Sequence, residues 1–509
     1  MLSLGDGSKR GYTPVWLLAP PTRPGQPGSA GSPKVVAVDD DLAYADVFTL
    51  RRDRVSAESL VHLLMRRIAD LDAPGSPIEL RSVLATSETA VEEARACDRS
   101  EPSGPLHGLP VLVKDSIAVA GLPSTAGATS LVGRPPASDA PLVRRLRDAG
   151  AVILGTTNLS EWANIRSAHS TSGWSAVGGL TGNPWALDRS PGGSSSGSGA
   201  ALAAGLVPLS VGTETDGSIT CPASVNGVAG IKPAVGSVPT AGVVPISSSQ
   251  DSPGPMARTV DEVAFLLEVL MAKPGILERA RQGVNGLRVG VARTWRTGHP
   301  GTDELFDDAL RRVVAAGAFA HDVQTAVPSP DDEEDELTVM LCELVDGMAA
   351  YLPSRGPDGP QDLAQVIAHE ISHASTELVH FGHDQFERAV ELGGTSTHAY
   401  KGARARNLAW AVETCLEPAF DGADVLIGPT YGPAWKSDLT LGDNVPASPI
   451  TKAPSIAGWP IATAPMGLVD GLPVGLGAVG RPGSEALLLA VCRTVEQFSR
   501  PTWRPGARG

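Results

Sequence analysis

Residues 191–198 read Pro-Gly-Gly-Ser-Ser-Ser-Gly-Ser, and residues 212–219 read Gly-Thr-Glu-Thr-Asp-Gly-Ser-Ile. Each stretch places a serine, Ser194 or Ser218, on a turn containing glycine, where backbone N–H groups can face a reacting oxygen. Taken alone, the first stretch could be a flexible Gly/Ser linker. It runs directly into a helix expected at 199–205 and a strand expected at 207–211, which leads to the second turn. This order favours two turns of one active site over a linker.

A lysine ends an apolar run upstream of both serine turns. Residues 108–115 read Gly-Leu-Pro-Val-Leu-Val-Lys-Asp, which predicts a buried strand at Val111–Val113 with Lys114 at its end. Burial disfavours the charged form of lysine and lowers its pKa from an ordinary value of about 10.4. Two serines and a neutral lysine suffice for nucleophilic acyl transfer without histidine.

The remaining pattern predicts alternating strands and helices. A helix is expected over 57–73, where Ser56 is a suitable N-cap. A second helix is expected over 138–149, and a strand follows at 151–154. Such alternation indicates parallel strands covered by helices. Further strands are expected at 287–291 and 424–427, and the acidic run 331–336 is expected to begin a solvated helix.

Composition excludes several classes of protein. The 509 residues carry a net charge of −15 without a dense Lys/Arg block, which makes nucleic acid and anionic membranes poor electrostatic partners. No stretch approaches the ~20 apolar residues of a spanning helix, and no signal peptide is apparent. Five scattered cysteines without a CxxC pair fit a reducing compartment. We therefore expect a cytoplasmic protein that contacts neither nucleic acid nor membrane; the sequence leaves a homodimer open.

The serine turns and the lysine resemble the motifs of the amidase signature family, the Ser-Ser-Lys hydrolases of carboxamides. Three further phrases match the family in order: residues 230–233 (GIKP), 253–260 (PGPMARTV) and 471–475 (GLPVG). The resemblance implies an α/β fold, with one large domain in which helices cover both faces of a mixed, mostly parallel β-sheet. The expected divisions are an N-terminal extension (1–35), the amidase signature domain (36–500), a helical substrate-specificity region inside it (295–420) and a C-terminal tail (501–509).

The resemblance also implies roles for individual residues. Lys114 would take a proton from Ser194, which relays protons to and from Ser218, and the Gly193–Ser194 peptide bond would be cis. Ser218 would attack the amide carbonyl of a small-molecule or peptide substrate and form an acyl-enzyme, which water hydrolyses to the acid after ammonia or an amine has left. No metal or cofactor is required. The backbone N–H groups of the oxyanion hole would belong to Thr215, Asp216, Gly217 and Ser218.

Four positions depart from common family patterns. Asp216 replaces a frequent glycine, and aspartate tolerates positive φ better than most residues if φ is positive there. Ser196 also replaces a glycine and adds a hydroxyl near the relay. Thr220 and Cys221 stand where some members have an arginine, which weakens the case for a substrate carboxylate held by arginine.

Two alternatives remain. The family includes the amidase subunit of the tRNA-dependent amidotransferase. Separately, residues 369–373 read His-Glu-Ile-Ser-His, the H-E-x-x-H pattern of zinc proteases, with Glu391 as a candidate third ligand. The surrounding segment, 363–389, instead resembles the central region of peptide-amidase-like bacterial members. Trp162, Phe381 and Trp459 could line an apolar pocket or belong to the core.

Overall fold

The computed structural model describes residues 41–445, 450–499 and 502. The predicted extension at 1–35 and nearly all of the predicted tail at 501–509 lie outside the described residues, and the predicted domain divisions stay a prediction. An 11-stranded sheet has the order β1-β3-β2-β6-β8-β7-β12-β13-β11-β9-β10. Its strands are β1 (Val83–Thr86), β2 (Pro110–Lys114), β3 (Val152–Thr157), β6 (Leu209–Glu214), β7 (Ala229–Lys232), β8 (Ser252–Ala257), β9 (Arg288–Ala292), β10 (Phe319–Val323), β11 (Val425–Pro429), β12 (Ile461–Val469) and β13 (Leu472–Val479). The short strands β4 (Trp174–Ser175) and β5 (Gly179–Leu180) form a separate pair.

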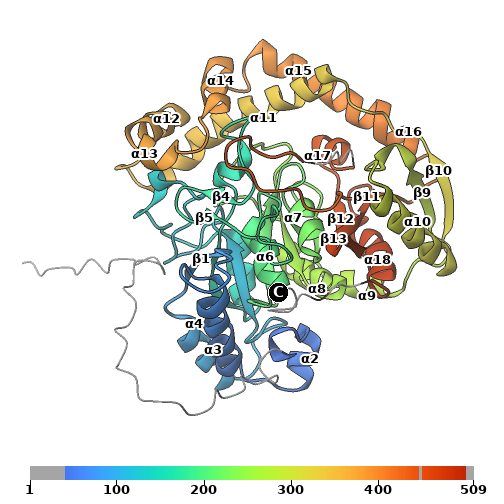
Figure 1. Ribbon diagram of the computed structural model, residues 1–509, viewed down its shortest axis with the longest axis horizontal. Coiled ribbons are helices and arrows are strands. Elements are labelled where there is room, and N and C mark those ends of the chain that lie inside the picture. Colours follow the sequence, from blue (N-terminus) through green and yellow to red (C-terminus); the bar gives the residue numbers. More distant parts are fainter. Residues whose placement is uncertain (1–40, 446–449, 500–501, 503–509) are drawn as a thin grey trace, which may run out of the picture.

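Helices lie on both faces of the sheet, and a further group of them forms an arch across the top of the view in Figure 1. Those packed near the sheet are α2 (Val47–Arg52), α3 (Ala57–Arg67), α4 (Ala90–Asp98), α5 (Pro141–Asp148), α6 (Ser196–Ala203), α7 (Thr220–Asn226), α8 (Val260–Met271), α9 (Ile276–Arg281), α10 (Pro300–Ala315), α17 (Lys452–Ala457) and α18 (Glu485–Glu496). The arch, yellow and orange in Figure 1, contains α11 (Pro330–Tyr351), α12 (Leu363–Ser372), α13 (Ala374–Glu377), α14 (Asp384–Leu392), α15 (His398–Leu408) and α16 (Glu417–Ala419). The helix-rich texture predicted for 295–420 is therefore present, while its role in specificity stays a prediction.

The α/β class and the mixed sheet are confirmed, but the expectation of mostly parallel pairing is wrong. Parallel pairs join β2 to β3 and β6, and β9 to β10 and β11. The other six pairings are antiparallel. The reason is local connectivity: β12 and β13 form a hairpin around the positive-φ residues Asp470 and Gly471, and a hairpin can join only antiparallel strands.

Several predicted elements are confirmed with small shifts. Ser56 caps α3, whose N-terminus is as expected, and Ile68–Asp72 continue it as a π-helical turn. The helix predicted from 138 begins at Pro141, because proline suits the first turn, where its missing N–H has no partner to lose. The acidic run opens α11 after Ser329, which forms a capping box with Asp332, but the predicted solvation fails for Asp335 and Glu336, which are buried.

One segment, Pro330–Arg355, is long enough to span a membrane and has a mean hydropathy of 1.2. Its side chains show internal packing: the buried Glu336 accepts from Gln250, and the buried Glu343 accepts from Ser247 and Tyr400. Carboxylates bonded to other parts of the chain are typical of a helix packed within the protein, since charged groups avoid lipid. Length and composition alone are weak evidence for a span.

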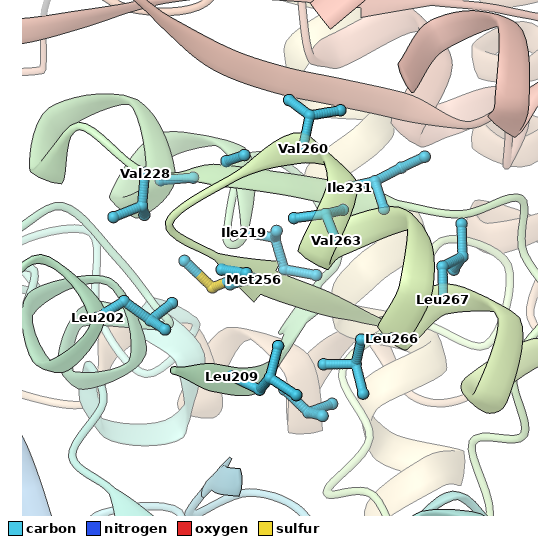
Figure 2. Close-up of a cluster of buried hydrophobic side chains, with 14 of the residues drawn as sticks. Leu202, Leu209, Ile219, Val228, Ile231, Met256, Val260, Val263, Leu266 and Leu267 are labelled. Atoms are coloured by element: carbon cyan, nitrogen blue, oxygen red, sulfur yellow. The ribbon is translucent and has the colours of Figure 1, made fainter. Parts of the chain in front are cut away.

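The central core fixes the residue that follows Ser218. Ile219 lies among apolar side chains of β6, β8 and α8, close to Met256 (Figure 2). Three strand glycines leave room for it, because a Cβ added at Gly212, Gly230 or Gly254 would approach an Ile219 carbon to 3.2, 2.9 or 3.0 Å. Glycines on three neighbouring strands thus leave the space in which Ile219 packs, and this packing holds the second serine turn against the sheet.

We expect Gly254→Ala to destabilise the fold by about 1–3 kcal/mol, the usual cost of overpacking a core. The added Cβ would lie 2.1 Å from the carbonyl oxygen of Ile231, a backbone atom that cannot move alone. Urea unfolding measures the change. Gly382→Ala is the matched control, since no atom lies within 4 Å of a Cβ there; equal midpoints for the two variants would contradict the packing account.

Candidate active site

Lys114 is fully buried at the end of β2, as its apolar run predicts. Its Nζ donates to Ser194 Oγ at 2.7 Å, to Thr213 Oγ1 at 2.9 Å and to the Thr213 carbonyl at 3.3 Å. Burial lowers the pKa of Lys114 to about 7, against the charges of Asp251 and Glu214, which raise it. Near neutral pH a substantial fraction of this lysine can therefore act as a base.

The structure brings the two serine turns together. The Ser195 N–H donates to the carbonyl of Ser218 at 3.0 Å, and the Gly193–Ser194 peptide bond is cis, as the resemblance implies. Ser194 is completely buried, whereas Ser218 keeps 9% of its surface exposed. Lys114, Ser194 and Ser218 thus form one constellation in which Ser218 is the member open to solvent.

The backbone after β6 is held by side chains on both sides. The buried Glu214 carboxylate accepts from the N–H groups of Ile219 at 2.6 Å and Thr220 at 2.8 Å. Burial raises the pKa of Glu214, while the charge of Lys232 opposes that rise. These bonds hold the two residues that follow Ser218, at the start of α7. They therefore restrict movement of the segment predicted to form the oxyanion hole.

Gly217 has a positive φ of 80°, whereas Asp216 has not. Aspartate therefore replaces the frequent glycine at position 216 without the backbone strain that a positive φ would bring. The Asp216 carboxylate instead accepts from Ser455 Oγ at 3.4 Å and lies 3.9 Å from Lys452 Nζ. Lys452 also pairs with Glu336 of α11. The side chain of Asp216 therefore joins the oxyanion segment to α17 and α11.

The other departures have structural explanations. The Ser196 hydroxyl donates to the Gly192 carbonyl at 2.6 Å and so closes the first serine turn. Thr220 Oγ1 lies 3.2 Å from the Glu214 carboxylate, and Cys221 is buried in a small apolar cluster with Tyr431. Neither Thr220 nor Cys221 offers a cation to a substrate.

The H-E-x-x-H residues have other partners. His369 Nε2 lies 3.0 Å from Thr129 Oγ1, and His373 Nδ1 lies 2.9 Å from the His369 carbonyl oxygen. Within the described ranges, one group of carboxylates could hold a metal: Glu161, Glu370 and Glu377.

That carboxylate group already surrounds a buried arginine. Arg166 Nη1 forms ion pairs with Glu161, with Glu377 at 3.4 Å and with Glu370 at 4.0 Å. Glu370 also contacts His383 Nδ1 at 2.8 Å. Burial raises the pKa of Glu370 to about 8. The central Glu of the motif thus belongs to an internal ion cluster, and the two histidine rings contact Thr129 Oγ1 and the His369 carbonyl oxygen.

The aromatic residues divide between pocket and core. Trp162 lines a small cavity of about 10 Å³ together with Thr213, Thr215 and Asp251. Phe381 packs against Trp174 and lies over the Arg166 guanidinium, and Trp459 packs against Phe420. Of the three, Trp162 is therefore the one placed near the catalytic constellation.

Sequence reasoning missed three buried charges near the site: Glu214 and Asp251, which act on Lys114, and Lys232, which acts on Glu214. Burial lowers the pKa of Lys232 to about 8, and its Nζ donates to the Trp459 carbonyl at 3.0 Å. All three lie in or next to the motifs matched to the family. Ionisable residues within or beside these largely apolar motifs could therefore have identified them from the sequence.

Comparison with known proteins agrees with this geometry. A sequence model of the family described as Amidase matches residues 61–489. The solved structure of native peptide amidase from Stenotrophomonas maltophilia is similar with a TM-score of 0.84 and 38% identity, covering 91% of this chain and 98% of that one. A probable amidase from Arabidopsis thaliana is 34% identical, with 87% of each chain covered. A glutamyl-tRNA(Gln) amidotransferase subunit from Methanosarcina acetivorans is 32% identical, covering 82% of this chain and 90% of that one.

A buried lysine that donates to a serine, with a cis peptide bond directly before that serine, on a mixed sheet, defines a class of amide hydrolase. The chain belongs to the amidase signature family and is an amidohydrolase of that family.

Proposed function

We propose that this protein hydrolyses the C–N bond of a carboxamide through a Ser218 acyl-enzyme, with Ser194 as proton relay and Lys114 as base. The observation that carries the proposal is the 2.7 Å contact from Lys114 Nζ to Ser194 Oγ, between two fully buried side chains. A hydroxyl attacks a carbonyl only when a base removes its proton during attack. Because burial brings the pKa of Lys114 to about 7, its neutral amine can serve at neutral pH.

Protons and bonds balance at each step of the proposed reaction. The Ser218 hydroxyl proton passes to Ser194, and the Ser194 proton passes to Lys114, while Ser218 Oγ bonds to the carbonyl carbon. Collapse of the tetrahedral intermediate breaks the C–N bond, and the leaving nitrogen collects a proton returned through Ser194. Water then adds to the ester by the same path and releases the acid.

The backbone supplies the oxyanion hole in this proposal. The N–H groups of Thr215, Asp216, Gly217 and Ser218 stabilise the negative oxygen of the intermediate; losing one such donor typically costs about 10²–10³ in rate. Support comes from the anchoring of this segment at three points: Asp251 holds Thr215, Ser455 holds Asp216, and Glu214 holds Ile219.

We propose a peptide amide as substrate, with alkyl and aryl amides as the alternatives within the same reaction. The 38% identity with a peptide amidase over nearly its whole chain supports this choice. Five free cysteines support a reducing, cytoplasmic place for the reaction.

The second candidate is an amidotransferase subunit, favoured by the 32% identity with such subunits. The bonding of Thr220 to Glu214 counts against it, because no side-chain cation is provided there for a substrate carboxylate.

Ammonia release from three neutral amides tests these alternatives: N-acetylphenylalaninamide, hexanamide and benzamide. We expect the peptide amide to have a kcat/KM at least about tenfold above the other two, a difference of about 1.4 kcal/mol in transition-state binding. EDTA should leave the rate unchanged. Preference for benzamide or hexanamide would refute the peptide assignment. Ammonia release that depends on charged tRNA and co-purified subunits would favour the amidotransferase, and loss on chelation reversed by zinc would favour the metal site.

A further inference from the structure

Asp251 precedes β8 and binds the oxyanion segment from outside the two serine turns. Its Oδ1 accepts from Thr215 Oγ1 at 2.6 Å. Its Oδ2 accepts from the N–H groups of Ile246 at 2.8 Å and Ser247 at 3.0 Å. Three donors therefore hold both carboxylate oxygens, and Asp251 links Thr215 to the backbone at Ile246 and Ser247.

The same carboxylate lies on the lysine side of the site. Asp251 lines one small cavity with Thr215 and with Thr213, whose hydroxyl and carbonyl accept from Lys114. The charged groups that act on Lys114 are Asp251 first and Glu214 second. Those that act on Asp251 include Glu343 of α11, and Asp251 in turn acts on Lys232.

We propose that Asp251 is a positioning residue for amide hydrolysis: its carboxylate holds Thr215 at the start of the oxyanion segment and places a fixed negative charge beside Lys114. The proposal rests on the proposed function, because it assigns work to Lys114 as base. Nothing in Asp251 itself touches the reacting atoms.

The charge has a direct chemical consequence. Burial alone would make Lys114 a weak base, since a low-dielectric site disfavours the ammonium that forms when the lysine takes the Ser194 proton. A nearby carboxylate stabilises that ammonium, so proton transfer to Lys114 becomes less costly. Burial raises the pKa of the Asp251 carboxyl to about 6, which leaves it mostly ionised where Lys114 is neutral.

The tether acts on a different step. The N–H groups that stabilise the oxyanion must be in place before the intermediate forms. Because Thr215 is the first residue of that segment, releasing its side chain loosens the hole without changing the charge near Lys114. The two roles of Asp251 can therefore be separated by mutation.

The test compares the kinetics of Asp251→Asn, Asp251→Glu and Thr215→Val, with N-acetylphenylalaninamide as substrate. Asp251→Asn keeps the size but not the charge; we expect kcat to fall about 10–100-fold with KM within about threefold. The acidic limb of kcat/KM should move down by about one pH unit, because the Lys114 ammonium loses a negative charge that stabilises it. Thr215→Val should lower kcat without moving the acidic limb. Asp251→Glu keeps the negative charge, so its acidic limb should lie at the wild-type pH.

Two results would overturn the proposal. One is an Asp251→Asn enzyme with kcat within threefold of wild type and an unmoved limb. The other is a limb that moves as far in Thr215→Val as in Asp251→Asn. If Asp251→Asn does not fold, a Thr215→Val enzyme with wild-type kcat, or an Asp251→Glu enzyme with a displaced limb, overturns the proposal. Lys114→Met run in parallel separates the failures: an active Lys114→Met enzyme refutes the proposed function, whereas an inactive one beside a normal Asp251→Asn refutes this inference alone.

Discussion

Lys114→Met lowers kcat for amide hydrolysis by about 10²–10⁴-fold, the range attributed to a positioned general base. Methionine fills nearly the same volume and cannot accept a proton. The side chain has no solvent access, so water has no room to replace the amine at Ser194 without rearrangement. Steady-state ammonia release measures the loss.

The fold should tolerate this change, because methionine removes a group whose charged form burial disfavours. Urea unfolding of Lys114→Met checks this, and Lys436→Met, at an exposed surface lysine, controls for loss of a lysine as such. A loss of less than tenfold in kcat would contradict the assignment of Lys114 as base.

In the wild-type enzyme the same group sets the acidic limb of the pH profile. With a pKa near 7, Lys114 is charged and inactive below that pH and neutral and active above it. Activity should therefore rise through about pH 7 and hold on the alkaline side. Lys114→Met should lack this limb, which ties the limb to one residue.

Local sequence patterns were enough to predict the parts of the site that each lie at the end of one element. An apolar strand that ends in lysine predicts Lys114 at the end of β2, and two glycine-bearing stretches predict turns at Ser194 and Ser218. The structure confirms all three positions. Their roles were implied by family resemblance, because spacing alone does not show that Ser218 is the serine open to solvent.

The rest depends on contacts between distant parts of the chain. Asp251 acts on Lys114 only because β8 pairs with β6, and Lys232 acts on Glu214 from a different strand. Pairing of this kind also explains why parallel strands do not dominate the sheet: β6, β8, β7 and β12 are joined in antiparallel succession. No periodicity in one segment encodes its partner strand.

The histidine motif shows the opposite case, in which a strong local pattern does not reveal the partners that its residues contact. His369, Glu370 and His373 have the spacing of a zinc site on a helix. Glu370 turns inward to Arg166, which three buried carboxylates surround. A buried guanidinium satisfies such carboxylates as a metal ion would, and its presence is visible only once loops far apart in sequence are placed together.

Ser218→Ala should reduce amide hydrolysis by about 10⁴-fold or more, because it removes the atom that forms the acyl-enzyme and leaves only binding and the oxyanion hole. Substrate affinity should change little, since one small hydroxyl at the edge of the site is lost.

The wild-type acyl-enzyme should transfer its acyl group to hydroxylamine as a hydroxamate, and Ser218→Ala should form none. Because Ser194 and Ser218 act on one proton path, Ser194→Ala/Ser218→Ala should be no slower than Ser218→Ala. Ser100→Ala, at an exposed position, controls for handling. More than about 1% residual activity in Ser218→Ala, with hydroxamate still formed, would assign the nucleophile to another residue.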